Sequence, residues 1–367
     1  MSTHTTYEEW LEYQKRERAW LEPYLARLDI ELEVEQPHVS GERFFMQAVT
    51  TASGRKLILL GKRTTDGARV VVKATSDPDG IRELTHAHTC RATLHHIGFA
   101  YDMFHSPEEI HFESTRDRCV SVQRFIPQSC AFLERTIEEQ FSYALASFKA
   151  QERAHATTHS HLREVRGVFA TYTTPDYLET FDAFLAPVAG YTHDTTPLAR
   201  MRSARAHIAE PDTIERYCGF LTHTDFVPHN FRIHDGVMYL LDHSSLRFGN
   251  KHESWARFLN FMTLYHPALE QALLQYVRDN RAPEEYASLT LIRMYRLGEL
   301  IRYYVRACEM TEGDLNTLNH ARVRFWADVL EAVLENRPLS DTIRTEYTHT
   351  RDALRSGEEK KRQVGLH

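Results

Sequence analysis

Residues 221–250 read LTHTDFVPHNFRIHDGVMYLLDHSSLRFGN, and this stretch carries the strongest indication of the fold. Its first part places three polar side chains close together, at His223, Asp225 and Asn230. Its second part ends in another carboxylate, Asp242, directly after an apolar run. Phosphoryl transfer uses such a set, because one carboxylate can hold an acceptor hydroxyl while an amide and a second carboxylate hold magnesium on nucleotide phosphates.

A β-hairpin is predicted between the loop and Asp242. Phe231 and Ile233 alternate with polar neighbours, the dipeptide at 235–236 is Asp-Gly, and an apolar run follows. Asp-Gly between two such runs is a strong signal of a two-residue hairpin turn. The loop and Asp242 should therefore lie at neighbouring ends of paired strands. The alternative is a plain surface loop, in which the Asp caps the backbone and the Asn occupies a turn position.

The loop resembles that of the aminoglycoside phosphotransferase and choline kinase family, which commonly reads H-G-D-x-H-P-x-N before a strand ending in I-D. Asp242 takes the place of the second Asp, and the other matching residues are His223, Asp225, Pro228 and Asn230. Thr224 stands where the family usually has Gly. The following segment, SLRFGNKHESWARFLNF, is also similar to the family's R-x-G-x-x-x-x-D-L-A region, with Glu253 or Ser254 where a carboxylate usually begins the helix.

The resemblance implies a two-lobed, protein-kinase-like α+β fold. A small N-terminal lobe with a five-stranded antiparallel sheet and a helix would precede a larger, mainly helical C-terminal lobe. The resemblance also implies an enzyme that uses ATP, or another nucleoside triphosphate, and Mg2+ to phosphorylate a hydroxyl group of a small molecule. Asp225 would orient the acceptor and take its proton, Asn230 and Asp242 would bind the metal, and His223 would support the loop by hydrogen bonding.

The N-terminal part of the sequence predicts a lobe of this kind. Five β-rich runs, separated largely by short turn clusters, predict an antiparallel sheet, and they cover residues 43–51, 55–63, 68–74, 109–113 and 118–125. A helical pattern over 7–28 precedes residues 30–35, in which apolar and acidic residues alternate. An amphipathic helix is therefore expected to lead into an edge strand or hairpin of the sheet.

Two residues of this lobe are assigned to the nucleotide site. Lys73 emerges from an apolar, β-branched run, and by resemblance it is the strand lysine that binds the α and β phosphates. An ordinary lysine at a strand end, facing solvent, is the alternative. In the resembled family, an acid on the following helix orients this lysine, and Glu83 is the only acid in the helix predicted over 81–96, so the resemblance makes it the candidate partner of Lys73.

Two backbone segments complete the expected nucleotide site. The turn at Ser53 and Gly54 would cover the phosphates. The segment from Gln123 through Phe125 to Ile126 ends the last strand and should cross between the lobes. In the resembled family, backbone groups of that connector bind the adenine edge.

The C-terminal part is predicted to be helical. It forms the second lobe, residues 126–367, after a first lobe of residues 1–125 whose helical extension lies within 1–40. Its helices are expected at 133–157, 175–189, 195–217, 253–262, 266–279, 283–309 and 314–336. The helix over 283–309 carries four arginines, Arg293, Arg296, Arg302 and Arg306. They either line an acceptor pocket or form a solvated helix face, and we favour the solvated face.

Composition narrows the class of protein further. A chain of 367 residues exceeds what one core usually holds. The formal charge of -7 gives no basic footprint, so nucleic acid is not an expected partner. The five cysteines form no C-x-x-C pair, and no run resembles a signal peptide or a membrane span. We therefore expect a soluble, cytoplasmic protein with reduced thiols and no membrane partner; its oligomeric state does not follow from the sequence.

Two other functions remain open at this point. The chain could be a kinase-like protein that binds a nucleotide or another ligand without transferring phosphate. It could also be a kinase that acts on protein side chains, which needs an activation segment and a peptide groove. The helix predicted near Glu253 begins soon after Asp242, and this short interval disfavours a protein kinase.

Overall fold

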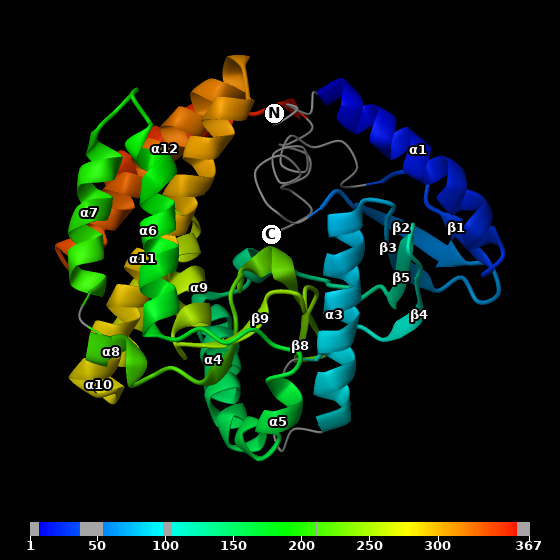
Figure 1. Cartoon of the computed structure of the whole chain (residues 1–367), viewed down its shortest axis with the longest axis horizontal. Coiled ribbons are helices and arrows are strands. Elements are labelled where there is room, and N and C mark those ends of the chain that lie inside the picture. Colours follow the sequence, from blue (N-terminus) through cyan, green and yellow to red (C-terminus); the bar gives the residue numbers. More distant parts are fainter. Residues whose placement is uncertain (1–6, 37–53, 98–104, 210, 358–367) are drawn as a thin grey trace.

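A five-stranded antiparallel sheet forms the centre of the N-terminal lobe (Figure 1). The computed structural model describes residues 7–36, 54–97, 105–209 and 211–357. Within them the strand order is β1-β2-β3-β5-β4. The strands are β1 Ile30–Leu32, β2 Leu57–Arg63, β3 Arg69–Thr75, β4 Glu109–Ser114 and β5 Cys119–Arg124. All neighbouring pairs are antiparallel, which confirms the predicted type of sheet.

The edge strand β1 comes from the alternating residues that follow the first helix. Ile30 lies opposite Arg63 of β2, and Leu32 lies opposite Gly61. The edge strand expected after that helix is therefore confirmed. The strand predicted at 43–51 lies entirely within 37–53, outside the described residues.

The sheet has two different faces, because side chains alternate along each strand. One face packs against α1, Tyr7–Ala26, and the two share a buried apolar cluster. The main members of this cluster are Trp10, Tyr13, Leu21, Leu25, Leu57, Leu59, Val70, Val72 and Val122. The opposite face carries Lys73, which lies opposite Ser121 of β5.

Helix α3, Pro78–Ile97, belongs to both lobes (Figure 1). Its Arg91 pairs with Glu109 of β4, and Glu109 also accepts a hydrogen bond from Ser121. Its last turns carry Leu94 and Ile97, which are buried in the core of the C-terminal lobe. The helix therefore covers the Lys73 face of the sheet and fixes the sheet relative to the C-terminal lobe.

The C-terminal lobe is mainly helical (Figure 1). Its helices are α4 Ile137–Ser160, α5 Leu162–Val165, α6 Thr174–Ala189, α7 Thr196–Ile208, α8 Pro211–Glu215, α9 Glu253–Tyr265, α10 Pro267–Asn280, α11 Pro283–Met310, α12 Gly313–Leu334 and α13 Asp341–Leu354. The helix predicted over 195–217 is divided into α7 and α8, consistent with Pro211, which has no N–H to continue a helix. Helix α13 was not predicted. No helix in the described ranges combines the length and the apolar character that crossing a bilayer requires.

Two small sheets in this lobe frame the loop at 224–230. Strand β6, Phe220–His223, pairs with β9, Leu246–Gly249, and β7, Phe231–His234, pairs with β8, Val237–Leu240. Asp235 and Gly236 both have positive φ, at 50° and 77°, as a type I′ turn requires. The predicted hairpin is therefore confirmed, whereas the β6–β9 pair was not predicted.

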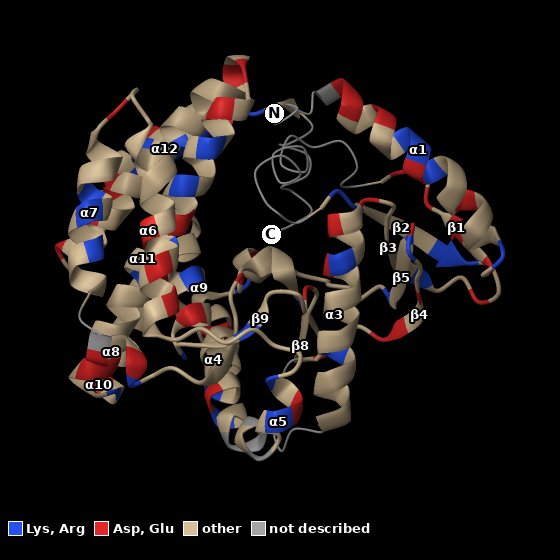
Figure 2. Ribbon diagram, viewed as in Figure 1, with Lys and Arg blue, Asp and Glu red and all other residues tan. Residues whose placement is uncertain are grey.

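Charged residues of both signs are interspersed along α1 and the C-terminal helices (Figure 2). The prediction that the arginines of α11 form a solvated face is wrong for Arg293 and Arg296. Arg293 and Arg296 are buried and pair with Glu270 and Glu253, respectively. A guanidinium is tolerated inside a protein when it is paired with a carboxylate, so these two side chains neutralise acids within the lobe.

Candidate active site

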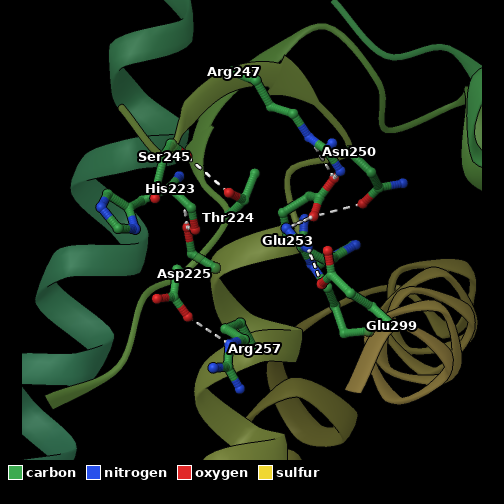
Figure 3. A network of polar contacts seen from close by, with 12 residues as sticks. His223, Thr224, Asp225, Ser245, Arg247, Asn250, Glu253, Arg257 and Glu299 are labelled. Carbon is green, nitrogen blue, oxygen red and sulfur yellow. Dashed lines mark hydrogen bonds and ion pairs between the residues drawn. The ribbon is translucent and has the colours of Figure 1, made fainter. Parts of the chain in front are cut away.

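The loop between β6 and β7 is held at its start by Thr224 (Figure 3). The backbone N–H and the hydroxyl of Thr224 both donate to the carbonyl oxygen of Ser245, at 2.8 and 3.0 Å. The backbone N–H of His223 donates to Oγ of Ser254 in the first turn of α9. The loop is thus bound both to the segment after Asp242 and to α9. Thr224, in place of the family's usual Gly, contributes one of these bonds through its side chain.

Asp225 points from the loop toward α9 (Figure 3). Its Oδ1 accepts from Nε of Arg257 and its Oδ2 from Nδ2 of Asn230, both at 2.7 Å. Burial acts to raise the pKa of Asp225, but the charges of Arg257 and His229 outweigh burial and hold that pKa well below its usual range. Asp225 is therefore ionised at neutral pH, and 37% of its side chain is exposed, so it can receive a hydroxyl group.

The amide of Asn230 is oriented by Asp225. Its Nδ2 donates both to the backbone oxygen of Asp225, at 2.8 Å, and to the carboxylate. Because the nitrogen is fixed on that side, the amide oxygen faces away from Asp225 and is left as an oxygen ligand.

His223 links the loop to Asp242. Its ring is fully buried, and burial lowers its pKa because water no longer stabilises the imidazolium. The neutral ring donates from Nε2 to the backbone oxygen of Asp242 at 2.6 Å, since a carbonyl can only accept. This hydrogen bond therefore holds the loop that carries Asp225 against the backbone of Asp242, and it involves neither carboxylate.

The carboxylate of Asp242 is bound on both of its oxygens. Oδ1 accepts from the backbone N–H and the hydroxyl of Ser244, at 3.0 and 2.7 Å, and Oδ2 accepts from the hydroxyl of Ser245 at 2.8 Å. Burial acts to raise the pKa of Asp242. Two nearby cations, Lys56 and then Lys73, hold it below its usual range instead.

Lys73 reaches from β3 to the C-terminal lobe. Its Nζ donates to the backbone oxygen of Leu241, the residue before Asp242, at 2.9 Å. Burial lowers the pKa of Lys73 to about 8, and the neighbouring Lys56 acts in the same direction. Lys73 is thus positioned between the lobes, and the alternative of a strand-end lysine in solvent does not hold.

Glu83 does not take the partner that was predicted for it. Its carboxylate forms an ion pair with Nζ of Lys56, immediately before β2, while Lys73 donates to Leu241. The reason is the position of Glu83 in the first turns of α3, which begins just after Thr75 at the end of β3. These turns lie near the start of β2, where Leu57 is opposite Ala74. The predicted pair of Glu83 with Lys73 is corrected accordingly.

The connector between the lobes follows the expected path out of β5. Gln123 is buried, and the backbone N–H of Phe125 donates to the oxygen of Arg69 at 3.1 Å. The guanidinium of Arg69 also lies 4.2 Å from the centre of the Phe125 ring. Ile126 is buried at the entry to the C-terminal lobe. Adenine binding by this segment remains a prediction.

The turn assigned to the phosphates is only partly described, because Ser53 lies outside the described residues. Gly54 packs against the start of α3: a Cβ there would lie 2.0 Å from the backbone nitrogen of Gly80 and 2.3 Å from Oδ1 of Asp77. Asp77 caps this helix by accepting from the Gly80 N–H at 3.2 Å. Close packing on α3 therefore requires glycine at 54, whether or not the turn also covers phosphates.

A buried ion network lies behind the loop (Figure 3). Glu253, the first residue of α9, is fully buried and pairs with Arg247 of β9 and Arg296 of α11. The hydroxyl of Tyr177 also donates to Glu253. Glu253 is therefore the carboxylate expected at the start of this helix, and Ser254 binds the loop backbone.

Two side chains of the site were not predicted, Arg257 and Lys56. Arg257 had a signal in the sequence, since it is the one charged residue of α9 after its first position, in a helix whose other residues are mostly apolar. A lone cation in such a helix indicates a specific partner. Lys56 had no such signal, because it lies beside a turn, where lysine is unremarkable.

The donors at this site suit a hard divalent cation and a nucleotide. The Asp242 carboxylate and the Asn230 amide both offer oxygen, which Mg2+ prefers. Magnesium commonly takes only one or two protein carboxylates and completes its coordination with phosphate and water. Lys73, whose Nζ contacts the backbone oxygen of the residue before Asp242, would offer positive charge to phosphate oxygens on such a metal.

Comparison with known proteins yields matches among solved structures. No protein-family model and no curated protein matches the chain. A thermostable mutant of aminoglycoside phosphotransferase APH(4)-Ia, solved with ADP and hygromycin B, gives a TM-score of 0.55 at 14% identity, over 86% of this chain and 98% of that one. The chain has the fold of this phosphotransferase.

Two further structures agree. The macrolide 2'-phosphotransferase MphH from Brachybacterium faecium gives a TM-score of 0.52 at 16% identity, over 83% of this chain and 97% of that one. The amicoumacin kinase hAmiN, solved with AMP-PNP and Ca2+, gives 0.53 at 14% identity, over 78% and 87%. The likeness indicated by residues 221–250 is thus confirmed at the level of the fold.

Proposed function

We propose that this protein is a phosphotransferase that moves the γ-phosphate of ATP, or of another nucleoside triphosphate, to a hydroxyl group of a small molecule. The observation that carries the proposal is the connected set Asp225, Asn230, Asp242 and Lys73. Asn230 contacts Asp225 at 2.7 Å, His223 joins the loop to Asp242 at 2.6 Å, and Lys73 contacts Leu241 at 2.9 Å.

Each of these residues has a distinct role in the proposed reaction. Asp225 holds the acceptor hydroxyl in line with the γ-phosphate and takes its proton late, because Arg257 keeps the carboxylate weakly basic. Asn230 and Asp242 hold Mg2+, which neutralises phosphate charge when bound. Lys73 binds phosphate oxygens. Catalysis of this type is mainly positioning and charge neutralisation.

The matched structures support this choice of chemistry. One was solved with ADP and hygromycin B and another with AMP-PNP, so a nucleoside triphosphate is the first donor to test. Their names describe kinases or phosphotransferases of aminoglycosides, macrolides and amicoumacin, all of them small molecules. A protein kinase is disfavoured, because β9 ends at Gly249 and α9 begins at Glu253, which leaves a short segment after Asp242.

The direct test is a coupled ADP-release screen over amino alcohols, sugars, nucleosides and aminoglycosides, with Asp225→Ala as the comparison. With an acceptor found in the screen, Asp225→Ala should retain its fold and nucleotide affinity but lose at least about 100-fold in kcat. Full activity in this variant would refute the role of Asp225. A wild-type protein that binds ATP and magnesium but phosphorylates nothing in the screen would favour the non-catalytic alternative.

A further inference from the structure

Lys56 lies on the same face of the sheet as Lys73. In the antiparallel pair of β2 and β3, Ile58 is directly opposite Lys73. Residues two apart along extended backbone point to the same face. Lys56 immediately precedes β2, and continuing this alternation by one residue gives it the face of Ile58 and Lys73. Its contact with α3 through Glu83 agrees, because α3 covers that face. Lys73 of β3 and Lys56, immediately before β2, therefore both point toward the junction of the lobes.

Glu83 holds the Lys56 ammonium in place. The two side chains are 17% and 18% exposed, respectively, so the pair is largely shielded from water. Such a pair is stronger than an exposed one and costs more to break, because a single charge would remain with little solvation. The long and flexible lysine side chain is thus fixed in one direction before any ligand binds.

Lys56 is directed toward Asp242 by the same geometry as Lys73. Nζ of Lys73 donates to the backbone oxygen of Leu241, the residue before Asp242, at 2.9 Å, and Lys56 projects beside it on the same face of the sheet. The two ammonium groups are also close enough to each other that Lys56 contributes to the lowered pKa of Lys73. Lys56, Lys73 and Asp242 thus form one electrostatic cluster at the proposed metal site.

The charge balance of this cluster points to its ligand. The cluster contains two lysines, one that contacts the residue before Asp242 and one that is paired with Glu83. When Asp242 donates its oxygens to a divalent cation, its charge is shared with the metal and no longer offsets the lysines. A polyanion that arrives with the metal restores the balance, and a triphosphate has oxygens enough to contact both ammonium groups.

We infer that Lys56 is a second phosphate-binding residue of the nucleotide site, and that Glu83 is the positioning residue for Lys56 and not for Lys73. The ligand class is the triphosphate group of a metal-bound nucleotide. This inference rests on the proposed function and deepens it, because it assigns a second cation and its support to the same site.

The test measures binding of AMP-PNP with Mg2+ by isothermal titration calorimetry on folded protein, so it does not depend on the acceptor. The variants are Lys56→Met, Lys56→Arg, Glu83→Gln and the double variant Lys56→Met/Glu83→Gln. Lys62→Met is the matched control, because Lys62 lies in β2, the strand that Lys56 immediately precedes, and is exposed. Lys73→Met tests the proposed function independently. Thermal unfolding without nucleotide verifies that each variant is folded at the temperature of the titration.

We expect Lys56→Met to weaken binding about 10-fold or more, from the loss of a charge-assisted contact. Lys56→Arg should recover most of this loss. Glu83→Gln should weaken binding about 3-fold to 10-fold, because Lys56 remains but is less well oriented. The double variant should bind no more weakly than Lys56→Met, since Glu83 acts through Lys56. Lys62→Met should bind like the wild type.

The outcomes that oppose the inference are distinct. If Lys73→Met weakens binding and Lys56→Met does not, the role of Lys56 is overturned and the proposed function stands. If the losses from Lys56→Met and Glu83→Gln add in the double variant, Glu83 does not act through Lys56. If the wild type binds neither AMP-PNP nor ATP with Mg2+, the proposed function fails and this inference fails with it.

Discussion

The ion pair between Asp225 and Arg257 determines both the basicity and the orientation of the Asp225 carboxylate. A carboxylate that receives a guanidinium at 2.7 Å is a weak base, because protonation would break the pair. The same contact, with that of Asn230, fixes both carboxylate oxygens. Asp225 is therefore suited to orient an acceptor hydroxyl more than to abstract its proton before transfer.

Replacing Arg257 should reduce catalysis without affecting the nucleotide. Arg257→Gln should lower kcat about 10-fold, because Asp225 loses one of its two side-chain contacts and samples other orientations. The dissociation constant of the nucleotide should change less than about 2-fold, since the metal and phosphate ligands are untouched. Steady-state kinetics with the acceptor from the screen, and calorimetry with AMP-PNP, measure the two effects.

Two variants serve as controls for this measurement. Arg257→Lys keeps the charge and should fall between the wild type and Arg257→Gln. Arg18→Gln removes an exposed arginine of α1 and should have no effect. An unchanged kcat in Arg257→Gln would show that Asn230 alone orients the carboxylate.

Glu285 gives a prediction for stability as a function of pH. Its pKa is lowered to about 2, first by His252, whose Nε2 lies 3.9 Å from the carboxylate, and then, against the effect of burial, by Lys251 and Arg281. A carboxyl group whose pKa is lower in the folded state stabilises that state above the unfolded pKa, near 4.5, and loses this contribution as pH falls toward 2.

Glu285→Gln should therefore be less stable than the wild type at pH 7, by about 1 to 2 kcal/mol after allowance for partial solvent screening. The difference between the two proteins should shrink steadily below about pH 5, because the carboxyl group of the unfolded wild-type chain becomes protonated near pH 4.5 while that of the folded state stays ionised until about pH 2. Urea unfolding at pH 7, 5, 4 and 3 measures it. A difference that stays constant over this range would contradict the assignment.

At the scale of elements, α9 joins the loop to the helices behind it. Glu253 opens the helix and pairs with arginines of β9 and α11, Ser254 binds the backbone of His223, and Arg257 binds Asp225. Three positions within about one turn of a single helix therefore support the active-site loop. A substitution at one of them should also disturb the contacts made by the other two.

Glu253→Gln should be one of the most destabilising conservative changes in the chain. It would leave Arg247 and Arg296 buried without their shared counter-charge, and breaking a buried ion pair by removing one partner typically costs about 3 to 5 kcal/mol. Urea unfolding at neutral pH measures this cost. Glu299→Gln, which removes an acid that also pairs with Arg296 but is 40% exposed, is the matched control and should cost less than about 1 kcal/mol. Equal costs for the two variants would show that burial of Glu253 is not the cause.

The sequence predicted those parts of the site that depend on local geometry. The Asp-Gly turn and the apolar alternation determine which residues of the hairpin lie opposite each other. Asp242, at the end of the second strand, could therefore be placed beside the loop that precedes the first strand. Most long helices were predicted for the same reason, since their periodic patterns are local. Lys56, Glu83 and Arg257 were assigned wrongly or missed, because their partners depend on how α3 and α9 pack against elements far away in the chain.

In the molecule as a whole, the residues proposed to bind the nucleotide and its metal come from both lobes. Lys56 and Lys73 belong to the N-terminal lobe, whereas Asn230 and Asp242 belong to the C-terminal lobe. The lobes are joined by the connector, by the packing of the end of α3 in the C-terminal core, and by the contact of Lys73 with Leu241. A ligand bound by residues of both lobes should therefore stabilise the whole molecule.

This arrangement predicts a magnesium-dependent stabilisation that requires Asp242. At an AMP-PNP concentration of 100 times its dissociation constant, the wild type should gain about 2.7 kcal/mol in free energy of unfolding. Asp242→Asn should lose the part of this gain that depends on Mg2+, because the site loses its one proposed carboxylate ligand and with it the negative charge that attracts the metal, while Lys56 and Lys73 still attract the nucleotide. Thermal unfolding with AMP-PNP, with and without EDTA, separates the two parts. The proposed metal site would be ruled out by an Asp242→Asn protein that shows the full wild-type response to magnesium.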